Sequence, residues 1–88
     1  MSVEECFRGI RDIATDADGD SFPTIKARID RFAAELQNSE LDRCQFLGEL
    51  RDKLESAAGA AAPTAASNLL EKAAQYADRL WLSWGCKR

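Results

Sequence analysis

Residues 69–84 read LLEKAAQYADRLWLSW, and this stretch decides the fold class. Its apolar side chains recur every three or four residues, which is the spacing of one face of an α-helix. The spacing predicts a helix over residues 64–84, with Gly85 as its C-terminal cap. The side chains expected to face inward are Ala66, Leu69, Leu70, Ala73, Tyr76, Ala77, Leu80, Trp81 and Trp84.

The same spacing predicts a first helix over residues 2–15. Ser2 and Glu5 have the separation of a capping box, in which a serine accepts a hydrogen bond from a free amide at the helix start. A turn rich in aspartate follows at residues 16–21. The predicted inward stripe of this helix is Val3, Cys6, Phe7, Ile10, Ile13 and Ala14.

Two further helices are predicted over residues 23–37 and 40–58. Pro23 suits the first turn of a helix, where its missing amide would have no partner. Ser39 and Asp42 repeat the capping separation at the start of the next helix. The alanine-rich residues 57–66 contain both Gly59 and Pro63, so we expect this third helix to fray near Gly59.

Four amphipathic helices with short connections predict an all-α fold, a small antiparallel four-helix bundle formed by residues 1–88 as a single domain. The very short connection at residues 38–39 predicts that the second and third helices are neighbours. A strand pattern is missing, because no stretch alternates apolar and polar residues over its length.

Composition excludes several classes of function. The 88 residues carry a net charge of −3, which disfavours binding of nucleic acid through bulk attraction. No apolar run approaches the roughly 20 residues that span a bilayer, so no membrane association is expected. Glu4 and Glu5 stand where an export signal would be basic, and we therefore expect a cytoplasmic protein.

The cysteines and the missing histidines bear on chemistry. Cys6, Cys44 and Cys86 have no close spacing of the kind found in zinc or redox sites, and we interpret them as reduced thiols. Cys6 and Cys44 lie on apolar stripes and are expected in the core, whereas Cys86 is either exposed or reactive. Without histidine the usual activating base for a cysteine is missing. We predict no catalytic residues, no cofactor and no enzyme activity.

The loop containing Asp16, Asp18 and Asp20 raises the question of a calcium site, because alternate carboxylates can converge on a hard cation. An EF-hand loop that began at Asp16 would need glycine where Ser21 stands and glutamate where Ala27 stands. We therefore interpret the loop as a solvated turn and predict no metal site.

Two other surfaces are weaker candidates. The short connection at residues 38–39 suits a helix-turn-helix pair, so a DNA-binding regulator is an alternative, although the charges of the third helix are mixed. Arg8 with Arg11, and Arg28 with Arg31, could form a patch for an acidic partner.

The end of the last helix is the most informative surface. Leu80, Trp81 and Trp84 share one side of the helix, and Leu82 lies roughly 160 to 200 degrees away from that side, so this end is apolar nearly all round. Tryptophans anchor many protein interfaces. Leu80, Trp81, Leu82 and Trp84 are the predicted partner-binding residues.

From this surface we predict a protein-binding module, meaning an inhibitor, an immunity-type protein or an adaptor, of the kind found in bacteria and their phages. Protein-protein interaction would then replace chemistry as its mode of action. Homodimers are included in this prediction, and a non-catalytic subunit of a larger enzyme complex is a further alternative. The other interpretation of the two tryptophans is that they plug the open end of the bundle.

Overall fold

Four α-helices account for the fold, and the computed structural model describes residues 1–19 and 21–87. The helices are α1 (Val3–Asp16), α2 (Phe22–Gln37), α3 (Arg43–Ala61) and α4 (Ala65–Ser83), with a short 3₁₀ helix η1 (Ala17–Gly19) after α1. No strand occurs in the described ranges. The predicted all-α four-helix bundle is confirmed.

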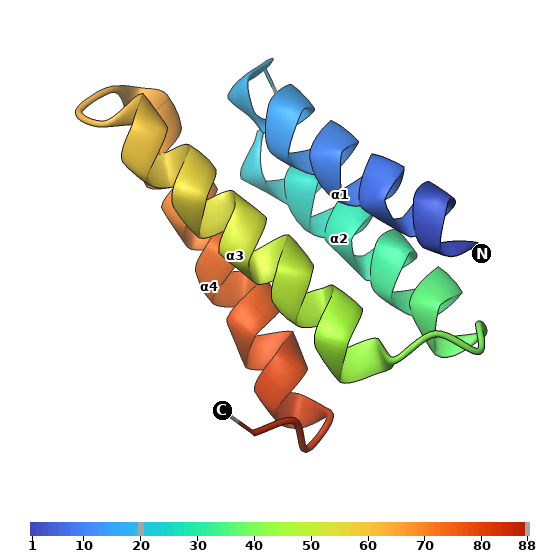
Figure 1. Ribbon diagram of the computed structural model, residues 1–88. Helices are drawn as coiled ribbons and strands as arrows, with labels where there is room; N and C mark the ends of the chain where they lie inside the picture. Colours follow the sequence, from blue (N-terminus) through green and yellow to red (C-terminus); the bar gives the residue numbers. More distant parts are fainter. Residues whose placement is uncertain (20, 88) are drawn as a thin grey trace.

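The helices alternate in direction along the chain, as Figure 1 shows. α3 and α4 form a hairpin and share the most extensive contact of the molecule, while α1 packs against α2 and α3. The connection between α2 and α3 spans residues 38–42, and these two helices contact each other less than α3 contacts α4 or α1. Chain proximity therefore did not make α2 and α3 the principal pair.

The start of α3 differs from the prediction. The carboxylate of Asp42 accepts a hydrogen bond from the amide of Gln45 at 3.1 Å, so Asp42 caps a helix that begins at Arg43 instead of residue 40. Ser39 serves the preceding turn, because its hydroxyl donates to the carbonyl of Leu36 at 2.7 Å. At α1 the predicted cap is confirmed, since Ser2 Oγ accepts from the amide of Glu5 at 3.2 Å.

The end of α3 also differs, because the helix continues through Gly59 to Ala61 and does not fray there. Alanine has the highest helix propensity of all residues, and the alanines around Gly59 offset the cost of one glycine. The hydroxyl of Ser67 in α4 donates to the carbonyl of Ala58 in α3 at 2.8 Å. This bond ties the tip of the α3–α4 hairpin together.

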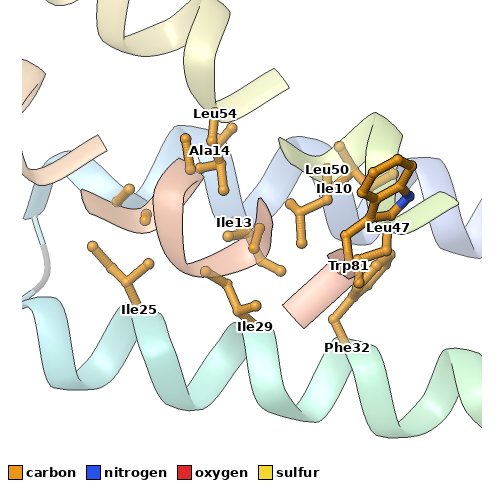
Figure 2. Close-up of a cluster of buried hydrophobic side chains, with 14 of the residues drawn as sticks. Ile10, Ile13, Ala14, Ile25, Ile29, Phe32, Leu47, Leu50, Leu54 and Trp81 are labelled. Atoms are coloured by element: carbon orange, nitrogen blue, oxygen red, sulfur yellow. The ribbon is translucent and has the colours of Figure 1, made fainter. Parts of the chain in front are cut away.

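All four helices supply the core, part of which appears in Figure 2. The fully buried large side chains are Ile25, Ile29, Leu36, Leu47, Leu50, Leu54 and Cys6. Val3 and Phe7 of α1 were predicted to face inward, but each is 46% exposed. They lie at the edge of the α1 stripe, where the packing of α2 and α3 no longer covers them.

Candidate binding surface at the end of α4

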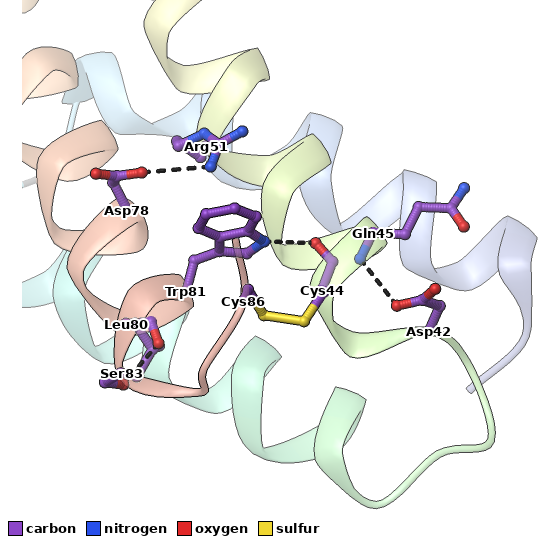
Figure 3. Close-up of a disulfide and its surroundings, with 9 residues drawn as sticks. All are labelled: Asp42, Cys44, Gln45, Arg51, Asp78, Leu80, Trp81, Ser83 and Cys86. Carbon is purple, nitrogen blue, oxygen red and sulfur yellow. Dashed lines mark hydrogen bonds and ion pairs between the residues drawn. A yellow bond between two sulfur atoms is a disulfide. The ribbon is translucent and has the colours of Figure 1, made fainter. Parts of the chain in front are cut away.

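Trp81 is a core residue that joins α4 to α3. Its side chain is only 6% exposed, and its Nε1–H donates a hydrogen bond of 2.7 Å to the carbonyl oxygen of Cys44 (Figure 3). The Arg51 guanidinium lies over the indole ring, 4.7 Å from its centroid. A tryptophan with a satisfied N–H and covered faces stabilises the hairpin and has little surface left for a partner.

Arg51 itself is held by two carboxylates. Its guanidinium pairs with Asp52 at 3.0 Å within α3 and with Asp78 of α4 at 3.3 Å. The Arg51 side chain is 12% exposed, so the Asp78 pair is screened less than an ordinary surface ion pair. Charge pairing and ring stacking therefore fix α4 against α3 just before its last turn.

A disulfide between Cys44 and Cys86 corrects the prediction of reduced thiols. Their Cα atoms are 5.7 Å apart, and the bond joins residues 42 positions apart in the sequence, as Figure 3 shows. Cys44 was expected in the core and Cys86 was expected to be exposed or reactive, yet the residue at 44 is exposed and the residue at 86 is buried. Cys6 remains a free thiol in the core, as predicted.

The chain beyond α4 turns back toward the helix. Gly85 has a positive φ of 81°, which glycine adopts without the steric cost that a Cβ would add, and the amide of Cys86 donates to the carbonyl of Trp81 at 3.3 Å. The C-cap itself is Trp84, one residue before the predicted Gly85, and Gly85 supplies the positive φ that ends the helix. This turn brings Cys86 to α3, where the disulfide fastens it.

The four predicted partner-binding residues divide into a buried and a surface group. Leu82 is 53% exposed, and Leu80 and Trp84 are partly buried against the core. Leu82 is two residues from Leu80 and from Trp84, so it points to the other side of the helix end. Trp81 is buried against α3. We define the α4 end surface as Leu80, Leu82 and Trp84, with Trp81 as its support.

The sequence stripe missed a second apolar surface on α1. We define the α1 patch as Met1, Val3 and Phe7, which are all exposed. The Phe7 ring meets the buried ring of Phe46 edge to face, with centroids 5.5 Å apart. The sequence does indicate that Phe7 lies at the edge of the core. Phe7 directly follows Cys6, and two adjacent residues of a helix cannot both point at the centre of the core.

Charged side chains of both signs line a groove between α1 and α2. The groove encloses about 410 Å³, and Arg8, Arg28 and Arg31 alternate there with Glu5, Asp12 and Glu35. Its floor includes Phe32. The arginine pairs predicted to form a patch for an acidic partner thus face carboxylates of their own chain, and Arg28 pairs with Asp16 at 3.3 Å.

The aspartate loop and the Cys6 thiol are the other candidates for chemistry. Of the aspartate loop, the structure describes the Asp16 side chain, whereas Asp20 and the Asp18 side chain lie outside the described residues. Within the described part of the chain, no three carboxylates and cysteines gather as metal ligands would. Burial raises the pKa of the Cys6 thiol, which keeps it protonated and unreactive at neutral pH.

Comparisons with family models, with curated proteins and with solved structures found no match to this chain. None of the described helices combines the length and the apolar character that crossing a bilayer requires.

Proposed function

We propose that the chain is a small protein-binding module that acts by covering a surface of another protein, as an inhibitor, an immunity-type protein or an adaptor does. Leu82 on one side of the helix end, and Trp84 with Leu80 on the other, would make the contact, and Trp81 would fasten this end to α3. The observation that supports this most is Leu82, a large apolar side chain 53% exposed on a helix end that a disulfide fastens.

Rigidity is what distinguishes this surface from a frayed helix end. Binding costs less entropy when the contacting side chains are already ordered, so a fastened surface binds more tightly than a mobile one of equal area. At the α4 end the order comes from three bonds: the Cys44–Cys86 disulfide, the Trp81–Cys44 hydrogen bond and the Arg51–Asp78 ion pair.

We also propose that the chain binds its partner without catalysing a reaction. The support for this is that Cys6 and Tyr76, whose pKa values are raised, belong respectively to the core and to the α2–α4 contact. Neither belongs to the α4 end surface, where a reacting group would have to meet a substrate.

The disulfide also bears on the cellular compartment in which the protein works. Cytoplasm was the expectation from the sequence, but disulfides persist mainly in oxidising compartments, so we propose that the module works in one. Alkylation in denaturant of the protein taken from its own cells, before and after reduction, tests this, because unfolding exposes the buried Cys6 thiol. One reactive thiol before reduction and three after would support the proposal, and three reactive thiols at the outset would contradict it.

Affinity capture tests the proposed surface. The parent chain, Leu82→Asp, Trp84→Ala and a control, Gln75→Ala, would each be used as bait in extracts of the source cells. Gln75 is an exposed polar residue of α4. We expect one or more proteins to be captured by the parent and the control but lost with both surface variants, because truncating a central apolar anchor weakens binding strongly.

Two results would contradict the proposal. One is a Leu82→Asp variant with unchanged circular dichroism that still captures every partner of the parent. The other is a salt-dependent, sequence-specific shift of DNA by the parent, which would favour the helix-turn-helix alternative instead. The exposed charges of α3 offer little for that alternative, since Arg43 and Lys53 stand among Glu49 and Glu55.

A further inference from the structure

We propose that two copies of this chain associate through the first half of α1, antiparallel and related by a twofold axis beside Phe7. This contact is separate from the α4 end surface and does not depend on the function proposed for it. α1 and α4 lie on different sides of the bundle, and each packs against α3.

The apolar part of the interface is the α1 patch. Val3 and Phe7 are one helical turn apart, and both are 46% exposed although they are large and apolar. They line a shallow depression together with Glu4, Arg8 and Arg11. An apolar centre flanked by charges is the usual layout of a protein contact.

The charges favour a second copy as the occupant. Glu4 and Arg11 are seven residues apart, so they lie on the same side of the helix and about 10 Å apart along its axis. The midpoint between them falls between Phe7 and Arg8. When a helix packs antiparallel against its own copy about that midpoint, each Glu4 faces the Arg11 of the other chain and both Phe7 side chains lie next to the axis.

A twofold axis requires this self-complementarity, because the same patch must serve both partners. In the described part of the chain Glu4 has no ion pair, and Arg11 pairs only with the neighbouring, solvent-exposed Asp12, at 3.7 Å. Both charges are therefore available to another molecule. Arg8 lies four residues from Glu4 and from Asp12, and these two carboxylates offset its charge near the axis.

The patch occupies half of one helix, so the dimer should form at high protein concentration and dissociate on dilution. Burial of Phe7 and Val3 provides most of the attraction, and the ion pairs set the register. Sedimentation equilibrium of the intact, disulfide-bonded chain over a range of concentrations measures the dissociation constant directly.

Charge reversal provides the decisive test. Glu4→Arg alone and Arg11→Glu alone should each weaken dimerisation roughly tenfold, because either change breaks both symmetry-related ion pairs and adds repulsion. The double variant Glu4→Arg/Arg11→Glu should restore the parent constant. A mixture of the two single variants should form heterodimers, in which every facing pair is again of opposite charge.

Controls separate the interface from general effects of charge. Glu71→Arg and Arg79→Glu alter exposed residues of α4 and should leave the dissociation constant unchanged. Phe7→Ala should weaken the dimer at least tenfold, with circular dichroism confirming that the helices remain.

A parent chain that stays monomeric at every concentration would overturn the proposal, as would a double variant that dimerises no better than the single ones. Loss of dimerisation in Leu82→Asp would move the contact to α4 and contradict it equally. If the affinity-capture experiment finds no partner for the α4 end surface, the proposed α1 dimer is not affected.

Discussion

Trp81 is the residue on which the end of the bundle depends. It combines a buried ring, a hydrogen bond to the backbone of α3 and a stacked guanidinium. Each of these contacts crosses from α4 to α3. Stability at this end should therefore respond to small changes in one side chain.

Trp81→Phe should lower the free energy of unfolding by about 1–3 kcal/mol. The substitution removes the indole hydrogen bond to the Cys44 carbonyl oxygen and opens a space beside Gly48, which lies against the indole. Urea denaturation followed by circular dichroism measures the change. Trp84→Phe is the matched control, because Trp84 is half-buried, and its loss of stability should be smaller.

The environment of Tyr76 predicts that the stability of the fold decreases at alkaline pH. Its hydroxyl donates a hydrogen bond to Asp30, and this bond, with burial and the carboxylate charge, raises the pKa of Tyr76 from 10.0 to about 12. A raised pKa means that the contribution of this residue to stability is fully present below pH 10 and is lost as the pH rises toward 12.

Tyr76→Phe should therefore flatten the fall in stability between these two pH values. Chemical denaturation of the parent and the variant at both ends of the interval provides the measurement. Equal slopes for the two proteins would show that Tyr76 does not ionise differently in the folded chain. Lys26, whose ammonium lies 5.2 Å from the ring centroid, stays in place in both proteins.

Periodicity predicted the four helices, but it did not predict the two ends of α3. Stripes of apolar residues predicted four helices because burial in a bundle imposes that spacing. Ser39 and Asp42 can both cap a helix, and only the packing of α3 decides which one does. Phe7 was misplaced for a similar reason, since the width of a stripe depends on how far the neighbouring helices reach.

Gly59→Ala should raise the free energy of unfolding by about 0.5–1 kcal/mol. α3 continues through this exposed position, and a Cβ there would meet no atom within 4 Å. Gly85→Ala provides the contrast, because φ at residue 85 is 81° and a Cβ is strained there. It should cost about 1–2 kcal/mol. Thermal unfolding of both variants beside the parent checks the opposite signs.

At the scale of the whole molecule, the sequence did not reveal which cysteines pair. Two thiols 42 residues apart meet only once α3 and α4 form their hairpin, with Cys44 near its open end and Cys86 just past it. Residue spacing alone carries no such information. Of the predicted anchors, Trp81 is buried and Leu82 is exposed, and their role in binding a partner stays a prediction.

Replacing both Cys44 and Cys86 by serine should destabilise the fold by about 2–4 kcal/mol, because the crosslink restricts the unfolded chain over a long loop. For a chain of 88 residues this is a large share of the stability expected of a small domain. Denaturation of the parent with and without reductant, and of the double variant, measures it. Reductant should have no effect on the double variant, and an equal response of both proteins would contradict the assignment.

Because the sulfur bridge closes residues 44–86 into a covalent ring, the hairpin has no free end through which α3 could slip away from α4. A protease that cut the connection at residues 62–64 would open the ring without releasing a fragment. The nicked protein would migrate as one species on a non-reducing gel and would separate into two peptides only after the disulfide was reduced.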